Sequence, residues 1–381
     1  MSTSDGLWTR RMNRRTFLGV AGAGAAAAAA ALGAGLAGCG AKSPSSSGAS
    51  ELASIKPKVD GDLNYFNWSE YLNPAIITGF EKEYGVKVHQ TYFDNMSGMM
   101  AKIRAGVAYD VTFPEAVEAY QLREGGYLLA YDHSELSSWK QVIPFFHNPW
   151  YDPQSLHTVP YVLWTTGIAW NSQKVPNMTG SWNDLWDHPE AKGYIELLND
   201  MHEVLGMALL RLGYDFNSVD PGQLSNAVDA VLQLKPSLRG FTSDDQITMA
   251  SGQVWIQHAW SGDVWLALSR MKASEKKYWK YETCKEGVPV GNDTIVIMKD
   301  APHPGTALLF IDWVLAHAAD NVGYTGYSMP TTAGIDAFGK VVSEYPSLNV
   351  TTEMLTHGVP FKYLGPAGLQ LWTQEWTKIM A

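Results

Sequence analysis

The sequence of 381 residues has only two cysteines, Cys39 and Cys284, and few basic residues: 28 Lys and Arg stand against 38 Asp and Glu. Two thiols exclude the framework of several disulfides that holds small secreted domains together. The shortage of positive charge argues against nucleic-acid binding, because the phosphate backbone requires a basic face. An acidic balance is compatible with a cationic solute as partner, although it also serves solubility alone.

Catalytic motifs are lacking as well. No His-Glu-x-x-His helix, Gly-x-Ser-x-Gly turn or glycine-rich phosphate loop is present, and the ten histidines are scattered. His202 stands beside Glu203, but a single His next to a carboxylate is more often a neighbour in a cleft than a catalytic or metal-binding group. Cys284 has no evident base and is expected to be a buried thiol. We therefore predict no catalytic residue, no metal and no cofactor. A secreted hydrolase that uses carboxylates, or a purely structural surface lipoprotein, remains an alternative.

The first 38 residues have the pattern of an export signal. Arg14 and Arg15, followed by Thr-Phe-Leu, resemble a twin-arginine leader, and Leu36-Ala-Gly-Cys39 resembles a lipobox at which the leader is cut and Cys39 is lipidated. A transmembrane anchor is the alternative, but the run is almost entirely Ala and Gly. Residues 39–59 are the predicted lipidated tether. We expect the protein in the cell envelope, periplasmic or anchored to the outer face of the cytoplasmic membrane.

The chain after the leader is long enough for two domains and follows an α/β pattern. Without residues 1–38 it has 343 residues, with 24 Lys and Arg against 37 Asp and Glu, a net charge of −13. DLNYF predicts a strand, PAIITGFEKEY a helix over 74–84 that ends at Gly85, and VKVHQTYF a second strand. Strand, helix and strand within about 30 residues predict a βαβ unit with parallel strands. The pattern continues with a helix over 116–124, a long strand over 159–171, a helix from about Asp263, and a helix over 306–318.

Acidic and aromatic residues follow three of the predicted strands. Trp68, Ser69, Glu70 and Tyr71 follow the first strand, Glu115 follows DVTFP, and Trp260 to Asp263 follow VWIQHA. In open α/β sheets, ligands bind beyond the carboxyl ends of the strands. Aromatic faces and carboxylates together are suited to an organic cation, which gains cation–π attraction and charge-assisted hydrogen bonds. A tryptophan at a strand end is nevertheless more often part of the core.

The same residues carry a resemblance. From Asp62 to Ile379 the sequence resembles the periplasmic spermidine/putrescine-binding proteins of ABC importers, with NYFNWSEYLNP, SWNDLWDHPEAKGYI, LLNDMHEVLGMALLRLGYD, AWSGDVW, GNDTIVI and GYTGYSMPT in the order of that family. The resemblance implies a periplasmic-binding-protein fold with two lobes, each a mixed sheet flanked by helices, joined by three hinge crossovers. It implies lobe I over 60–164 and 292–335, and lobe II over 165–291 and 336–381. It also implies a polyamine ligand, a membrane permease as partner, and a monomer.

Site residues follow from the resemblance position by position. It places Trp68, Ser69 and Tyr71 at the edge of the cleft, and Asp200 and Glu203 where the family has carboxylates for amine groups. It makes Trp260 the stacking aromatic, Asp293 the central carboxylate and Tyr327 a further cleft aromatic. Asp200 and Glu203, three residues apart at a helix start, would share one face, but an N-cap and a helix-dipole partner remain the alternative roles. The predicted ligand-binding residues are Trp68, Ser69, Glu70, Tyr71, Glu115, Asp200, Glu203, Trp260, Asp293, Tyr327 and Lys362.

Four positions depart from the family pattern. Glu115 and Val117 stand where the family has a small hydroxyl residue and a tyrosine, Gly291 replaces a second stacking tryptophan, and Lys362 aligns with an amide. The loss of an indole would leave room for a bulkier ligand. Lys362 would repel a distal ammonium and attract a carboxylate. The departures predict that spermidine is not the tightest ligand, and that an amino-acid or opine-like amine competes well.

Overall fold

The computed structural model describes residue 52, residues 54–93 and residues 95–381. The predicted signal peptide (1–38), Cys39 and most of the predicted tether lie outside these residues. The chain is attached to the body of the protein before the first strand. The Lys58 backbone N–H donates to the Gly305 carbonyl. The Asp60 carboxylate accepts hydrogen bonds from the backbone N–H groups of Gly305 and Thr306, at 2.9 Å each. Asp60 thereby caps the first turn of helix α9 (Pro304–Ala316) from a distant part of the sequence.

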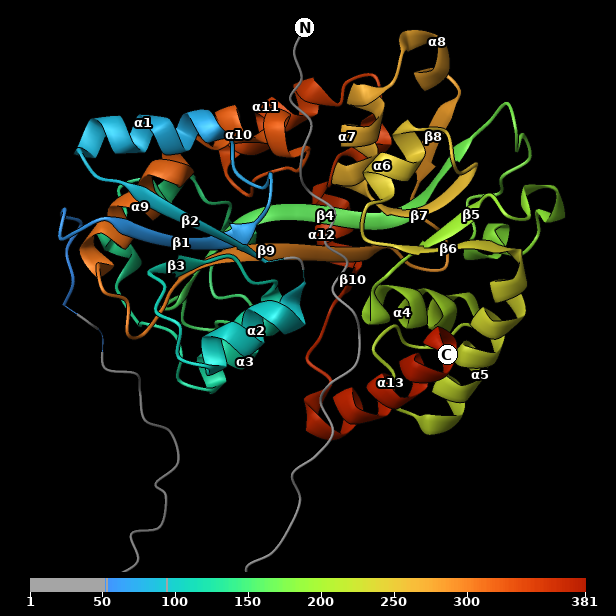
Figure 1. The fold of residues 1–381 in the computed structure, drawn as a ribbon, viewed down its shortest axis with the longest axis horizontal. Helices are drawn as coiled ribbons and strands as arrows, with labels where there is room; N and C mark the ends of the chain where they lie inside the picture. Colours follow the sequence, from blue (N-terminus) through green and yellow to red (C-terminus); the bar gives the residue numbers. More distant parts are fainter. Residues whose placement is uncertain (1–51, 53, 94) are drawn as a thin grey trace, which may run out of the picture. The chain divides into compact units, whose positions relative to one another are not determined.

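A ten-stranded mixed sheet runs through the described residues, with helices on both of its faces (Figure 1). The strand order is β2-β1-β3-β9-β4-β7-β5-β6, with β10 beside β9 and β8 beside β4. β2, β1 and β3 are parallel to one another, as are β7, β5 and β6. The strands are β1 (Leu63–Trp68), β2 (Val88–Phe93), β3 (Val111–Thr112), β4 (Thr158–Asn171), β5 (Ile195–Leu198), β6 (Leu238–Thr242), β7 (Ile256–Trp260), β8 (Trp279–Glu282), β9 (Pro289–Ile297) and β10 (Val359–Pro360).

β4 joins the two halves of the sheet. Its first part is antiparallel to β9 and its second part is antiparallel to β7 and β8. Every residue of β4 except Asn171 is buried, which explains why its sequence does not alternate between apolar and charged residues. Because β4 pairs with strands of both halves, it fixes the position of one half of the sheet relative to the other.

The helices confirm the sequence prediction with small shifts at their ends. Pro74 opens α1, and Gly85 follows its last residue in the left-handed conformation, at φ 68°. The predicted helix over 116–124 is α3, and α7 begins at Ser261, two residues before the prediction. These three helices have the bounds α1 (Pro74–Tyr84), α3 (Ala116–Glu124) and α7 (Ser261–Arg270). The other helices are α2 (Met96–Arg104), α4 (Met201–Arg211), α5 (Pro221–Leu234), α6 (Asp245–Ala250), α8 (Ala273–Lys276), α10 (Ala318–Thr325), α11 (Thr332–Val341), α12 (Thr352–His357) and α13 (Gly365–Met380), in addition to α9.

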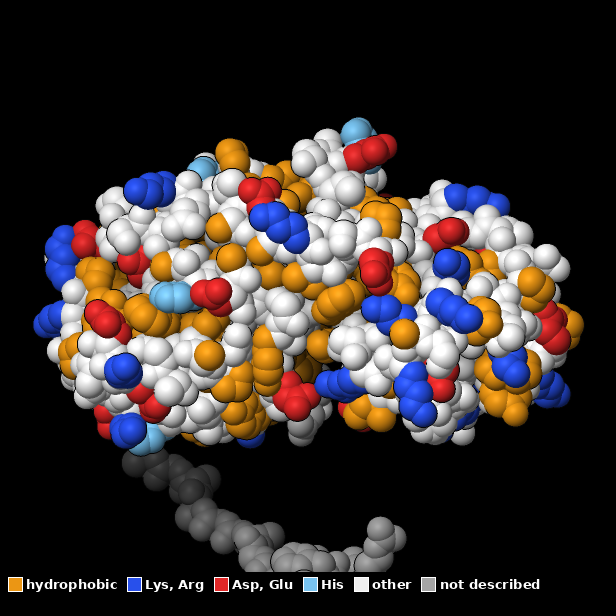
Figure 2. Space-filling model, turned by 90° about the horizontal axis from the view of Figure 1, so that it is seen from above, with side chains coloured by type: hydrophobic (Ala, Val, Ile, Leu, Met, Phe, Trp, Pro, Cys, Tyr) orange, Lys and Arg blue, Asp and Glu red, His pale blue; other side chains and the backbone are white. Residues whose placement is uncertain are grey.

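The core is divided among three clusters of buried apolar side chains. The largest includes Phe80 and Phe310, whose rings meet edge to face at 5.1 Å, and a second is built around Trp182 and Trp372. Cys284 is buried in the second cluster and is free, as the sequence predicts. Acidic and basic side chains are interspersed over the face shown in Figure 2. In the part of the chain that the structure describes, no helix is long and apolar enough to cross a membrane.

Candidate functional site

Four of the predicted acids meet around the middle of the sheet. Glu115, before α3, forms an isolated antiparallel bridge with Asp293 of β9. Asp293 accepts a hydrogen bond at 2.8 Å from the hydroxyl of Tyr71, which lies in the loop between β1 and α1. The charges of Asp200 and Glu203, from the start of α4, also act on Glu115. The fold therefore brings four acids from the loop before α3, the start of α4 and β9 to one place. The strand-end rule singled out Glu115 among them, and the resemblance placed the other three.

Asp293 lies at the centre of this group. It is 2% exposed, and its Oδ1 has no hydrogen-bond partner among the described residues. Burial raises the pKa of Asp293 to about 7, although the hydrogen bond from Tyr71 lowers it. The Tyr71 ring meets the Tyr327 ring edge to face at 5.7 Å. One predicted aromatic residue, Tyr71, thus contacts a carboxylate with a free oxygen, and a second, Tyr327, packs on Tyr71.

Glu203 is the second buried carboxylate, at 2% exposure. Its Oε1 accepts hydrogen bonds from the Trp260 indole at 2.6 Å and the Thr166 hydroxyl at 2.8 Å. Its Oε2 has no partner among the described residues. Burial, and then the charge of Asp200, raises the pKa of Glu203 to about 8. Asp200 itself accepts from the Glu203 backbone N–H at 2.9 Å, so the alternative N-cap role of Asp200 is confirmed.

Glu118 belongs to the same group and was not predicted. It lies one helical turn after Glu115 on α3, and its Oε2 is buried without a partner. Burial raises the pKa of Glu118 to about 8, with smaller contributions from Asp200 and Asp293. Burial, and then the charge of Glu118, also raises the pKa of Glu115 well above its usual range. The spacing of three residues between two acids on a predicted helix was the available signal.

We call Glu115, Glu118, Asp200, Glu203 and Asp293 the carboxylate cluster. No ion pair links any of the five to a lysine or arginine within the described residues. Partly or fully buried like charges without a counterion are unfavourable unless the groups are protonated or a cation joins them. No set of three or more His, Cys, Asp or Glu in this part of the chain is arranged to hold a metal ion. The arrangement suits an organic cation bounded by aromatic rings.

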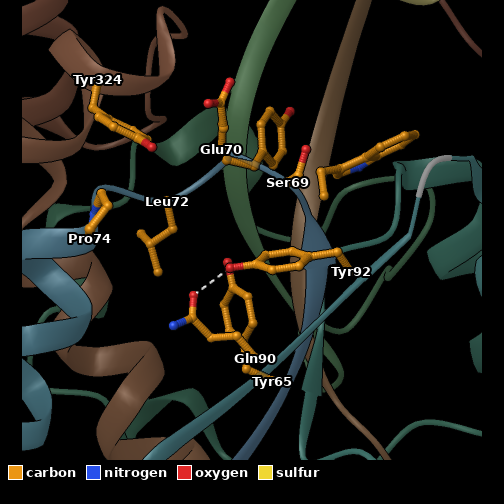
Figure 3. A pocket seen from close by; sticks show the side chains of 10 residues that line it. Tyr65, Ser69, Glu70, Leu72, Pro74, Gln90, Tyr92 and Tyr324 are labelled. Carbon is orange, nitrogen blue, oxygen red and sulfur yellow. Dashed lines mark hydrogen bonds between the residues drawn. The ribbon is translucent and has the colours of Figure 1, made fainter. Parts of the chain in front are cut away.

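Glu70 lies apart from the carboxylate cluster, against the prediction. Its carboxylate is 73% exposed and stands 3.6 Å from the guanidinium of Arg270 on α7. A left-handed backbone at Glu70, with φ 55°, turns its side chain outward in the loop between β1 and α1. Trp68, Ser69 and Glu70 line a surface hollow of about 240 Å³, together with Tyr92 and Tyr324 (Figure 3). Of the four predicted residues in this loop, Tyr71 alone hydrogen-bonds to the carboxylate cluster.

Lys362 also lies outside the cluster. It is exposed, and its backbone N–H donates to the Asn217 side-chain oxygen at 2.9 Å. The preceding residue, Phe361, lines the small space next to Glu115 and Gly291 instead. The expectation that Lys362 repels an ammonium in the site therefore lacks a contact to support it.

Gly291 does not leave the space that its sequence predicts. A Cβ atom added at Gly291 would lie 2.2 Å from Cζ2 of Trp164, so the indole of a neighbouring strand already fills that volume. The expectation of room for a bulkier ligand at this position is wrong. The sequence did not reveal the occupant because Trp164 and Gly291 are distant in the chain and meet only through the pairing of β4 with β9.

Tyr327 and His202 have structural partners. The Tyr327 hydroxyl donates to Asp263 Oδ1 at 2.7 Å. Asp263 adjoins the fully buried Asp245, and burial raises the pKa of both carboxyls. His202 Nε2 is 3.0 Å from the Asn217 side-chain oxygen, and burial among aromatic rings lowers the pKa of His202 to about 4. His202 therefore has a partner other than Glu203, as expected for a neighbour in a cleft.

Comparison with known proteins identifies the class. Residues 75–350 match the family model described as bacterial extracellular solute-binding protein. The chain belongs to this family, which consists of solute-binding transport proteins and is not a family of enzymes. It has the two-lobed α/β fold of periplasmic solute-binding proteins.

Within the family, the similar proteins include polyamine-binding members. The spermidine/putrescine-binding periplasmic protein of Salmonella typhimurium is 31% identical over 306 residues, which cover 78% of this chain and 86% of that protein. The protein of that name from Escherichia coli is 30% identical, with 82% and 90% covered. The solved structure of the spermidine/putrescine ABC transporter substrate-binding protein PotD from Streptococcus pneumoniae has a TM-score of 0.72 and 27% identity, covering 84% of this chain and 99% of that one.

Proposed function

We propose that this protein is the exported solute-binding component of an ABC importer and that it captures a linear polyamine of the spermidine/putrescine class. The observation that carries the proposal is the carboxylate cluster. Glu118, Glu203 and Asp293 each have one buried carboxylate oxygen without a partner among the described residues. A primary ammonium group supplies positive charge and three donors, and the secondary ammonium of spermidine supplies positive charge and two donors, which match these free acceptors.

The aromatic residues support a ligand with methylene segments between its charges. The Trp260 indole is held next to Glu203 by its hydrogen bond, Tyr71 donates to Asp293, and the Tyr327 ring packs edge to face on Tyr71. Aromatic faces cover methylene groups through apolar contact and attract ammonium by about 0.5–2 kcal/mol. With Lys362 exposed and the volume at Gly291 filled, no feature of these two positions favours a ligand that carries an anion or a bulky group.

The same proposal includes the route of the ligand. We assign residues 60–164 and 292–335 to one lobe and 165–291 and 336–381 to the other, with β4 and β9 among the crossovers. The lobes close by hinge motion on the amine, and the closed form docks on a membrane permease. The relatives named above are periplasmic, which supports export of this chain.

Calorimetry with matched ligands tests the binding proposal. Spermidine and putrescine should bind the purified protein at one site and raise its melting temperature. The control is 1,4-butanediol, which has the length of putrescine but no charge, and which should not bind. Failure of both amines to bind, or equal binding of the diol, would exclude the polyamine assignment.

The leader gives a separate prediction. Wild-type protein should partition with membranes and should carry acyl chains on Cys39, whereas Cys39→Ala should yield unacylated protein that is released or unprocessed. Fractionation and mass spectrometry of the N-terminal peptide provide the measurement. Unacylated wild-type protein in the culture supernatant would contradict the lipobox assignment and leave the polyamine assignment untouched.

A further inference from the structure

We propose that Trp164 supplies the second aromatic wall of the polyamine site, and that Gly291 is glycine because the Trp164 indole occupies its side-chain volume. This inference rests on the proposed function and names a specificity residue for it. The resemblance places the lost tryptophan at Gly291; the geometry points to its replacement on the neighbouring strand.

The first step is the pairing of the two residues. Trp164 of β4 and Gly291 of β9 are directly opposite each other in the antiparallel register. Side chains opposite each other in such a pair lie on the same face of the sheet. A Cβ at Gly291 would meet Cζ2 of Trp164 at 2.2 Å and Cε2 at 2.3 Å. The indole therefore occupies the volume that any side chain at Gly291 would need, so glycine at one position of the pair allows tryptophan at the other.

The second step is the position of Trp164 in the site. Its side chain lines the small space next to Glu115, Gly291 and Phe361, and Gly291 is two residues before Asp293. Trp164 and Trp260 also both lie beside the Glu203 carboxyl, where they oppose the rise in its pKa that burial causes. One tryptophan from β4 and one from the end of β7 thus adjoin the same carboxylate.

The third step is that Trp164 is not satisfied as an ordinary core residue. Its side chain is buried, at 6% exposure, yet the indole Nε1 has no hydrogen-bond partner among the described residues. Buried indoles usually place their N–H against an acceptor. Glu203 Oε2 is a buried acceptor without a partner at the same site. The Trp164 N–H is thus directed at the Glu203 carboxyl, whose pKa it lowers as a hydrogen-bond donor, and not at an acceptor in the core.

The functional consequence concerns the shape of the ligand. Trp164 on β4 lies on the same face of the sheet as a side chain at Gly291 on β9 would. The site therefore keeps two indoles, Trp164 and Trp260, and the narrow cross-section that a linear amine requires. We therefore expect spermidine or putrescine to bind better than an amine with a bulky substituent. This expectation reverses the one drawn from the glycine in the sequence.

A reciprocal exchange tests the inference. The proteins compared are the wild type, Trp164→Gly, Gly291→Trp and the double variant that carries both changes. Gly291→Trp alone should lower the melting temperature without ligand, because two indoles would compete for one volume, and Trp164→Gly alone should weaken spermidine binding by about tenfold or more. The double variant should recover a substantial part of both losses.

A matched control separates the wall from general stability. Trp170 lies six residues further along β4, is 7% exposed, and packs in the core cluster around Trp182. Trp164→Leu and Trp170→Leu should both lower the melting temperature, but the first alone should weaken spermidine binding. Calorimetry gives the affinity and thermal unfolding without ligand gives the stability.

The outcomes distinguish this inference from the proposed function. If wild type binds spermidine and Trp164→Leu binds it within twofold, the wall assignment is overturned and the proposed function stands. If wild type binds no polyamine, the proposed function fails and the role of Trp164 as a wall fails with it. The melting temperatures of the wild type, the two single variants and the double variant still show whether the two side chains compete for one volume. A double variant no more stable than Gly291→Trp alone would overturn that pairing.

Discussion

At the scale of single residues, the site is defined by acids whose neighbours supply no positive charge. Asp293 and Glu203 each hold one oxygen through hydrogen bonds from the protein and leave the other oxygen free. Burial raises the pKa of both groups, so in the unliganded protein at neutral pH a fraction of these carboxyls is protonated. A bound cation would reverse this effect because it favours the charged form.

Asp293→Asn should weaken spermidine binding by about 2–5 kcal/mol, because it removes one partner of a buried charge pair. The unliganded protein should keep or slightly increase its melting temperature, since one member of a like-charged group is replaced by a neutral group of the same shape. Calorimetry and thermal unfolding measure the two effects. Unchanged affinity would remove Asp293 from the site, and a large loss of stability would assign it a structural role.

Glu70→Gln should leave spermidine affinity unchanged within about twofold and change stability by less than about 1 kcal/mol. The reason is its exposure: an exposed ion pair such as Glu70 with Arg270 contributes little and is screened by salt. Arg270→Gln is the control for the same ion pair. A loss of affinity that occurs with Glu70→Gln but not with Arg270→Gln would return Glu70 to the binding surface.

At the scale of elements, α4 shows how one residue combines a local and a tertiary role. Asp200 caps the helix through the Glu203 backbone N–H, and it also belongs to the carboxylate cluster. Local sequence rules predict the cap, whereas the second role depends on the strands that bring β5 next to β7. Both roles require an acceptor at this position, and only the second requires a charge.

Asp200→Asn should therefore keep the stability of the protein and weaken amine binding, because asparagine caps a helix about as well as aspartate. Asp200→Ala should in addition cost about 1 kcal/mol of stability. Asp220 provides the control: it caps α5 through the Gln223 N–H at 2.8 Å, and Asp220→Ala should lower stability by a similar amount without changing affinity. Equal affinities for wild type and Asp200→Asn would restrict Asp200 to capping.

At the scale of the whole molecule, buried acids and buried histidines give opposite dependences of stability on pH. Burial lowers the pKa of His133 and His202 to about 4 and that of His258 to about 3, so their neutral burial increases stability as pH rises toward 6.5. The acids whose pKa is raised act in the other direction, because the folded protein loses stability as they ionise with rising pH. Above pH 6.5 the contribution of the histidines levels off, since from about pH 7.5 they are neutral in both states.

The free energy of unfolding without ligand should therefore fall between pH 6.5 and pH 8.5. In this range Glu118, Glu203 and Asp293, with pKa values of about 8, 8 and 7, still bind protons in the folded state, whereas in the unfolded chain they have lost them near pH 4. Spermidine should bind more tightly as pH rises through this range and should release protons, which calorimetry in two buffers detects. A flat profile together with binding that releases no protons would show that the acids are already ionised.

The sequence by itself determined where the main helices and strands lie, and its acids and aromatic residues indicated the kind of ligand chemistry. Pro74 and Gly85 set the ends of α1, the apolar run from Val159 set β4, and acids at strand ends indicated a cation. These features are encoded by neighbours in the chain, through caps, turns and periodicity.

Only the tertiary structure decided which side chains come together in the proposed site. Glu70 turns outward at a left-handed residue, Lys362 is exposed while the neighbouring Phe361 lines the small space next to Glu115, and Glu118 joins the cluster through the packing of α3. Trp164 fills the volume at Gly291 because the register of β4 and β9 sets them opposite each other. Register depends on every pair along two strands that are distant in the sequence, so no local pattern around Gly291 could show which residue fills its place.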